Sequence, residues 1–281
     1  MVEKFRILLE LGKVRIASLS MLSVLAGYVL ASGGADGRAV AAAAGVFLLA
    51  CGAAALNQYQ ERDIDGRMER TMRRPLPSGR ITPRSALAAA ALMMLSGTAC
   101  LLPDWRAIAL GWFTIVWYNG VYTPLKRVTA FAAVPGGVVG AIPPAIGWVC
   151  GGGDLADPRI AAVSFFFFVW QIPHFWLLLM KVGDDYRRAG MPVLTAIFSR
   201  GQLSRITYVW LLAAAVASVS LALFGLASTW WIYAGFVTAA IWLGWHATAM
   251  LRSAGSHLAF KETNLFALIV ISLLSLSGFL K

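Results

Sequence analysis

Charged residues are scarce in this sequence, and this scarcity is the first guide to its surroundings. Asp, Glu, Lys and Arg make up 13% of its 281 residues, against about a quarter in a typical soluble domain. Hydrophobic residues make up 59%. A folded chain of this composition has too few polar groups to cover its surface in water. The composition therefore excludes an ordinary soluble domain and predicts that lipid surrounds most of the chain.

Cysteine is also rare. The three cysteines, Cys51, Cys100 and Cys150, lie inside or at the edge of apolar runs. Their spacing matches no metal-binding or redox motif. We interpret them as small core residues.

Long polar stretches are lacking too, and apolar runs follow one another along the whole chain. A membrane-spanning helix needs about 20 mostly apolar residues, and a helix satisfies its own backbone polar groups in lipid. We predict an all-α polytopic membrane protein, folded as a single domain over residues 1–281. The nine predicted spans are Val14–Ser32, Ala39–Gln58, Ser85–Leu102, Ala107–Tyr122, Thr129–Cys150, Ile160–Met180, Ile206–Leu226, Thr229–Leu251 and Thr263–Leu280.

The basic residues fall on one side of this arrangement. A net charge of +11 would suit a nucleic-acid partner. With the N-terminus in the cytoplasm, however, nearly all Lys and Arg residues fall in cytoplasmic segments, and the exceptions are Arg38, Arg106, Arg159 and Lys281. Cytoplasmic loops of membrane proteins carry this excess. We therefore predict a multi-pass protein of the cell (inner) membrane, with no nucleic-acid partner.

Two of the cytoplasmic loops are long and rich in both acidic and basic residues. They follow the second and the sixth predicted span, four spans apart. This spacing predicts two tandem four-helix units with a ninth helix added, and it places any chemistry at the cytoplasmic face.

The first acidic motif lies at the end of the second span. If the helix continues to residue 65, Asn57, Glu61 and Asp65 recur every four residues and share one face. Carboxylates together with phosphate oxygens are the ligands that Mg²⁺ prefers. The alternative is a solvated helix end whose acids pair with neighbouring arginines.

The second acidic motif, Asp184-Asp185, follows the sixth span and is flanked by basic residues such as Arg188. Adjacent carboxylates repel unless a cation lies between them. Two acidic clusters in equivalent positions could hold Mg²⁺ ions that bridge one diphosphate. An interfacial loop neutralised by arginines is the alternative for this motif.

Basic turns follow the second and fourth spans. The turn of residues 70–80 contains several arginines, among them Arg74, whose guanidinium groups match phosphate oxygens. A smaller turn carries Lys126 and Arg127. For most of these residues, a topology signal is the alternative interpretation.

His174 lies within the sixth span, ten residues before Asp184. In a continuous helix it would be about 15 Å deeper than that aspartate. There it could ligate a haem iron or relay a proton, or it could simply be a histidine bonded within a helix beside Pro173. The fourth and sixth spans are also rich in aromatic residues, which could line a tunnel for an isoprenoid and stabilise an allylic cation.

These stretches resemble the UbiA superfamily of intramembrane prenyltransferases, and within it the protoheme IX farnesyltransferase branch. The resemblance is carried by residues 57–82, 122–129, 136–148 and 173–194. It implies nine helices around a central cavity and two acidic motifs that hold Mg²⁺ and a diphosphate. The implied metal ligands are Asn57, Glu61, Asp65, Asp184 and Asp185, and the implied substrate-binding residues are Arg74, Lys126, Arg127, His174 and Arg188.

The resemblance further implies farnesyl diphosphate and haem B as substrates and haem O as the product. Two alternatives remain at this point: a UbiA-type enzyme with an aromatic quinone-precursor acceptor, and a transporter of an anionic lipid. Transporters place their coupling sites near the middle of the membrane, whereas the acidic residues here cluster at one face. The sequence therefore favours the enzyme.

Overall fold

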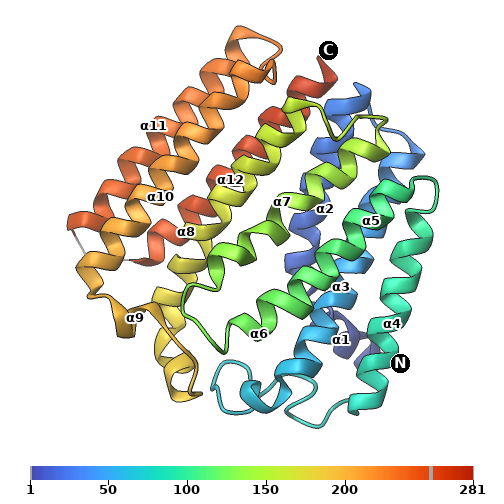
Figure 1. The fold of residues 1–281 in the computed structure, drawn as a ribbon, viewed down its shortest axis with the longest axis vertical. Coiled ribbons are helices and arrows are strands. Elements are labelled where there is room, and N and C mark those ends of the chain that lie inside the picture. Colours follow the sequence, from blue (N-terminus) through green and yellow to red (C-terminus); the bar gives the residue numbers. More distant parts are fainter. Residues whose placement is uncertain (1, 253–255, 281) are drawn as a thin grey trace.

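The computed structural model describes residues 2–252 and 256–280, and the elements in this part of the chain are helical. Figure 1 shows long helices packed side by side. In chain order the elements are α1 (Val2–Leu11), α2 (Val14–Ser32), α3 (Gly37–Asp65), α4 (Pro83–Cys100), α5 (Trp105–Ile115), the π-helix η1 (Val116–Tyr122), α6 (Thr123–Leu125), α7 (Ala133–Cys150), α8 (Pro158–Arg188), α9 (Leu194–Ile197), α10 (Arg200–Ser220), the 3₁₀-helix η2 (Leu221–Phe224), α11 (Trp230–Arg252) and α12 (Ser256–Phe279).

Seven helices in the described residues are long and apolar enough to cross a membrane: α2, α3, α7, α8, α10 with η2, α11 and α12. The chain is thus a multi-pass membrane protein. The predicted count of nine spans is not confirmed, and neither is the tandem four-helix arrangement. The third predicted span corresponds to α4, whose apolar run is diluted by the polar residues of its first turn. The fourth corresponds to α5, which has 11 α-helical residues before the π-helix η1 begins.

Two helices extend further than the predicted spans, and both extensions carry acidic residues. The helix α3 runs to Asp65, so the first motif is helical throughout. The helix α8 continues to Arg188 and keeps Pro173 in its interior. The second motif, which we expected in a loop, therefore lies on the last turns of a helix.

The helices α2 and α7 approach each other closely through glycine. A Cβ atom on Gly27 would lie 2.0 Å from the carbonyl oxygen of Pro144, and one on Gly147 would lie 1.9 Å from that of Val24. Membrane helices associate mainly through such close packing, because lipid provides no hydrophobic drive between them. This contact fixes α7 against α2 and so positions α8, which packs on α7.

Aspartates begin three helices at one end of the molecule. Asp36, Asp104 and Asp157 precede α3, α5 and α8, and each accepts a hydrogen bond from the backbone N–H two residues later. Such caps satisfy amides that a helix start leaves unpaired. In the latter two, the carboxylate also pairs with the side chain of that residue, as Arg106 lies 2.8 Å from Asp104 and Arg159 lies 2.5 Å from Asp157.

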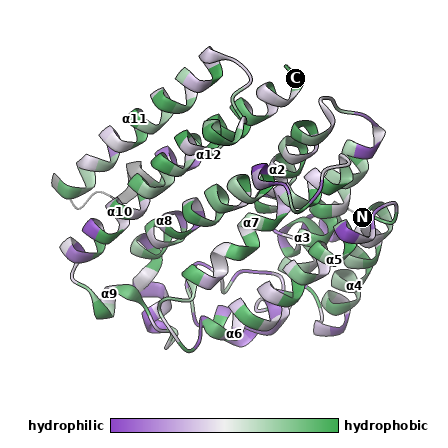
Figure 2. Cartoon of the chain, turned by 45° about the horizontal axis from the view of Figure 1, so that its top comes forward, coloured by the Kyte–Doolittle hydropathy of each residue, from purple (hydrophilic) through white to green (hydrophobic). Residues whose placement is uncertain are grey.

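The segment of residues 66–82, α6 and α9 lie at the opposite end, at the bottom of Figure 1. Figure 2 shows that hydrophilic residues gather in the segments around α6, whereas the long helices are mainly hydrophobic. Both acidic motifs reach this end, because α3 and α8 finish there.

Candidate functional site

The first acidic motif forms a buried polar stripe on α3. Asn57, Glu61 and Asp65 are all buried, and they lie on successive turns of one helix face. The Asn57 side chain joins this stripe to neighbouring segments. Its Nδ2 donates to Glu61 Oε2 at 2.9 Å and to Thr123 Oγ1 at 3.0 Å. The helix continuation that the sequence left open thus brings the three residues together.

Each buried carboxylate in this stripe has its own cation. Lys126 Nζ lies 2.6 Å from Glu61 Oε1, and Arg74 Nη1 lies 2.7 Å from Asp65 Oδ2. The two cations come from the two basic turns, which the fold brings to the end of α3. Thr71 anchors the first turn, since its hydroxyl donates to the Asp65 carbonyl oxygen at 2.8 Å. Two of the predicted substrate-binding residues therefore lie beside two of the predicted metal ligands.

Lys13 also belongs to this site, although no sequence motif pointed to it. It lies between α1 and α2, and its Nζ donates to Asn57 Oδ1 at 2.9 Å. Burial lowers the pKa of Lys13 to about 7, and the positive charges of Arg74 and Lys126 act in the same direction. In the sequence this residue was indistinguishable from the other basic residues of a cytoplasmic N-terminal arm.

The second motif places its two aspartates in different surroundings. Asp185 is buried and accepts hydrogen bonds from the backbone N–H groups of Glu69 and Arg70, both at 3.2 Å. Arg188 adds an ion pair at 3.0 Å. Asp184 is exposed. Asp185 thus ties α8 to the segment that follows α3, while Asp184 faces an open pocket.

That pocket has a volume of about 590 Å³ and lies between the segment after α3 and the end of α8. Its lining carries residues of both signs, which are Glu69, Arg70, Arg73, Lys181, Asp184, Asp185 and Arg188, together with Met72 and Val182. The second motif reaches the segment that follows Asp65, because Asp185 accepts from the backbone N–H groups of residues 69 and 70, while the first-motif side chains are not part of this lining. A charged opening of this kind can admit an anionic group.

Arg127 differs from the other predicted substrate-binding residues. Its Nη2 donates to the backbone oxygen of Gln60 at 2.6 Å, and the residue is exposed. It therefore braces α3 beside Glu61. We predicted the same substrate-binding role for Arg127 and Lys126, but Lys126 differs from Arg127 in making a direct ion pair in the buried stripe.

A continuous band of aromatic rings connects the first motif with His174. The ring of Tyr122 lies 5.8 Å from that of Tyr118 and 5.8 Å from that of Phe175. The Phe175 ring lies 5.7 Å from the His174 ring, which also lies 4.9 Å from the Trp170 ring and 5.0 Å from the Phe260 ring in tilted arrangements. Lys126 Nζ lies 5.1 Å from the Tyr122 ring centre, so the band begins at the charged site.

His174 has an unsatisfied nitrogen within this band. Its Nδ1 is buried and has no hydrogen-bond partner among the described residues. Buried polar atoms are usually paired, so such an atom is suited to meet a ligand. The helix α8 is continuous from Pro158 to Arg188. His174 therefore lies on the same helix as Asp184, ten residues before it, as the sequence predicted.

The donor set agrees with magnesium in its chemistry. The amide oxygen of Asn57 and the carboxylates of Glu61, Asp65 and Asp184 are hard oxygen ligands, which Mg²⁺ prefers together with phosphate oxygens. In the described residues, however, no three His, Cys, Asp or Glu side chains converge on one point. Lysine and arginine neutralise the buried carboxylates instead. The chemistry of these oxygen donors thus suits Mg²⁺, whereas their present arrangement is one of ion pairs.

Comparisons with known proteins give a consistent result. The sequence profile of the UbiA prenyltransferase family matches residues 20–270. A Geobacter sulfurreducens protein named protoheme IX farnesyltransferase is 42% identical over 226 residues, which cover 78% of this chain and 81% of that protein. A protein of the same name from Oleidesulfovibrio alaskensis is 41% identical over 193 residues, or 66% of each chain.

The fold also matches solved structures. A UbiA homologue from Archaeoglobus fulgidus, solved with GPP and Mg²⁺, superimposes with a TM-score of 0.75 at 13% identity and covers 97% of this chain and 98% of that one. At this identity the likeness concerns the fold alone.

Proposed function

Because this chain belongs to the UbiA prenyltransferase family, we propose that it transfers a farnesyl group from farnesyl diphosphate to a vinyl group of haem B, giving haem O. The bond between farnesyl C1 and the diphosphate oxygen breaks, and a vinyl carbon bonds to C1. Water adds to the resulting porphyrin cation and loses a proton, which leaves a hydroxyethylfarnesyl group. The relatives named protoheme IX farnesyltransferase support this choice of substrates.

The diphosphate end of the donor is assigned to the polar stripe on α3. Asn57, Glu61 and Asp65 would hold Mg²⁺ together with the aspartates of the second motif, Asp184 and Asp185. The metal would offset the negative charge that develops on the leaving diphosphate. The buried pairing of Glu61 and Asp65 with cations is the observation that carries this assignment.

The cations of the site would bind the diphosphate directly. Arg74 and Lys126 already lie within ion-pair distance of the buried carboxylates, so both reach the space where the diphosphate oxygens would lie. Arg127 and Arg188 are more exposed and would attract the anionic substrates at the rim. Arginine suits this role because it can bind phosphate oxygens through two N–H groups at once.

The aromatic band would cover the farnesyl chain and its reactive carbon. A π face attracts an allylic cation, and apolar rings exclude water from it. Tyr122 stands where the band meets Lys126, next to the diphosphate site. The unpaired His174 Nδ1 lies further along the band, where we assign it as a ligand of the haem iron.

We place the protein in the cell (inner) membrane as a single domain over residues 1–281. In this proposal α4 and α5 with η1 also lie in the membrane, which gives nine spans in two four-helix units plus one helix. The N-terminus and both acidic motifs face the cytoplasm. The basic residues of the segments near both motifs support this orientation.

The function is tested by incubating the purified protein in lipid nanodiscs with haem B, farnesyl diphosphate and Mg²⁺. Mass spectrometry of the extracted haem should show the addition of one farnesyl group and one water. A chelator should abolish the product, and added Mg²⁺ should restore it. Prenylation of an aromatic quinone precursor without any change to haem would overturn the proposed acceptor and leave the enzyme class in place.

A further inference from the structure

Lys13 has an unusual backbone conformation for a lysine. It lies at the junction of α1 and α2 with φ 48° and ψ 48°, and among the described residues it is the one non-glycine residue with positive φ. This left-handed conformation costs free energy in any residue with a Cβ atom. Glycine would adopt it freely, and Gly12 is the preceding residue. The fold therefore keeps a lysine where its backbone is strained.

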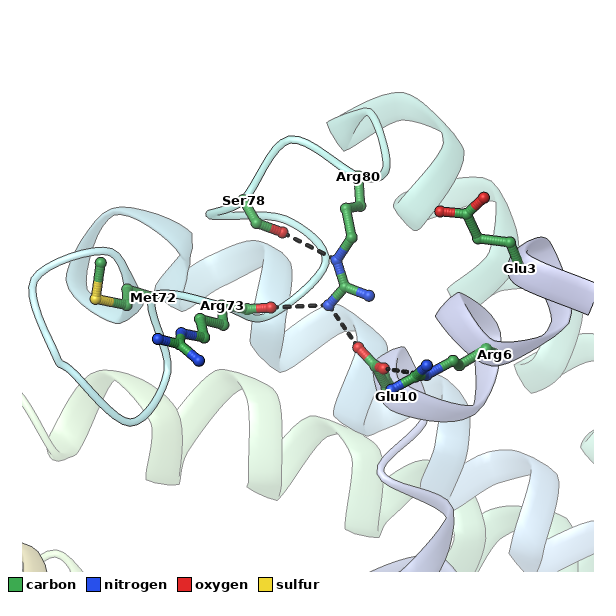
Figure 3. A pocket seen from close by; sticks show the side chains of 7 residues that line it. All are labelled: Glu3, Arg6, Glu10, Met72, Arg73, Ser78 and Arg80. Carbon is green, nitrogen blue, oxygen red and sulfur yellow. Dashed lines mark hydrogen bonds and ion pairs between the residues drawn. The ribbon is translucent and has the colours of Figure 1, made fainter.

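Contacts around α1 hold this strained turn in place. Gln58 Nε2 donates to the backbone oxygens of Glu10 at 2.9 Å and Leu11 at 2.8 Å, which fixes the end of α1 against α3. Glu10 in turn pairs with Arg80 at 2.5 Å. Figure 3 shows Arg80 reaching Glu10 as well as Ser78 and the backbone of Arg73, so α1 is also attached to the basic turn.

The turn aims the lysine amine into the polar stripe on α3. Lys13 Nζ donates to Asn57 Oδ1, and the charged groups that act on it most strongly are Arg74, Lys126, Glu61 and Asp65. Lys13, Arg74 and Lys126 thus each contact one residue of the polar stripe. An ammonium group has three N–H donors, and Asn57 uses one of them. The remaining donors, next to Arg74 and Lys126, suit the oxygen atoms of an anion.

We propose that Lys13 binds the diphosphate of the prenyl donor, and that the docking of α1 positions it to do so. This inference rests on the proposed function, because it assumes that the diphosphate lies at Asn57, Glu61 and Asp65. The diphosphate oxygens would accept hydrogen bonds from the N–H groups of Lys13 that Asn57 leaves unused. The strained conformation of Lys13 would then be retained because it directs the Lys13 amine toward the substrate.

The experiment compares two variants of Lys13 with a matched control. Lys13→Met removes the charge and keeps the side-chain length, and Lys13→Gly removes both the charge and the backbone strain. Arg15→Met removes one positive charge two residues away, at an exposed position. Affinity for farnesyl diphosphate with Mg²⁺ is measured by calorimetry on the purified full chain, alongside haem B affinity and thermal unfolding.

Both Lys13 variants should bind farnesyl diphosphate about ten- to a hundredfold more weakly, as expected for the loss of one charge-assisted hydrogen bond. Arg15→Met should bind like the wild type, and haem affinity should be unchanged throughout. Lys13→Gly should also unfold at the wild-type temperature or above it, because glycine relieves the strain. If Lys13→Gly binds farnesyl diphosphate more weakly but unfolds at the wild-type temperature, the loss of affinity is not caused by a loss of stability.

Three results would overturn the inference. Unchanged diphosphate affinity in both Lys13 variants would contradict it alone, with the proposed function intact. An equal loss of haem and diphosphate affinity would mean that Lys13 acts through the fold. Failure of the wild type to bind farnesyl diphosphate would instead remove the proposed function, and the inference with it.

Discussion

Asp184 and Asp185 are neighbours in the chain, yet the fold gives them opposite surroundings. Consecutive residues of an α-helix point about 100° apart, so one of the two can face the protein while the other faces the pocket. Asp185 is buried against two backbone N–H groups, and Asp184 is exposed. Of the two, Asp184 therefore has the more accessible carboxylate for a metal, while Asp185 also holds the surrounding segment in place.

At Asp65 the carboxylate itself is predicted to be essential. The change Asp65→Asn keeps the side-chain shape but removes the charge that would hold Mg²⁺, so turnover should fall at least a hundredfold, as losing more than about 2.7 kcal/mol of transition-state stabilisation implies. Turnover at limiting Mg²⁺ checks this, with thermal unfolding to confirm the fold. Asp63→Asn is the matched control, because Asp63 lies two residues away with an exposed side chain and should retain activity. Near-normal turnover of Asp65→Asn would refute the metal assignment.

His174 is predicted to determine how the acceptor binds. Because its Nδ1 is buried and unpaired, the change His174→Ala should alter the absorption spectrum of bound haem B and weaken its binding about tenfold or more, as for the loss of one ligand worth about 1.4 kcal/mol. Farnesyl diphosphate should still bind, since its site is built by other residues. An unchanged haem spectrum in His174→Ala would return this residue to a packing role, with the rest of the proposal unaffected.

At the scale of elements, the segment of residues 66–82 depends on the end of α8. The change Asp185→Ala removes the acceptor of two backbone N–H groups, and such a loss leaves buried donors unpaired at a cost of about 1–3 kcal/mol. The segment should open more often, so trypsin should cleave at its arginines about tenfold faster. Limited proteolysis in nanodiscs measures this rate. The neighbouring change Asp184→Ala should leave it unchanged, and equal rates in the two variants would disprove the tether.

The seven long apolar helices of the described residues could be predicted from the sequence because apolar length specifies them, whereas α4 and α5 do not meet that criterion. The periodicity of the first motif was also readable, since four-residue spacing maps directly onto one helix face. The extent of α8 was not, because charged residues after Met180 look like the start of a loop. In the fold the helix continues to Arg188, and Asp185 contacts the segment after α3. Lys13 could not be found either: 44 residues separate it from Asn57, and only the packing of α1 and α2 on α3 brings the two together.

At the scale of the whole molecule, the proposed orientation predicts which loops are accessible from each side. Cysteines introduced at Ser78 and Asp154, in a background without Cys51, Cys100 and Cys150, should react with impermeant reagents from opposite sides of the membrane. The two positions lie in segments at opposite ends of the helices. Labelling of right-side-out and inverted vesicles distinguishes them. Reaction of both positions from the same side would refute the proposed topology.

The capping aspartates at the other end also bear on how the chain enters the membrane. In the proposed orientation, the starts of α5 and α8 must cross the bilayer during synthesis. Moving one positive charge outward against an inside-negative potential takes about 2.3 kcal/mol of electrical work per 100 mV. Arg106 and Arg159 are paired with Asp104 and Asp157 only two residues away, so neither arginine crosses as an uncompensated positive charge. The aspartates that cap these helices would therefore also reduce the electrical work of moving the two arginines across the membrane.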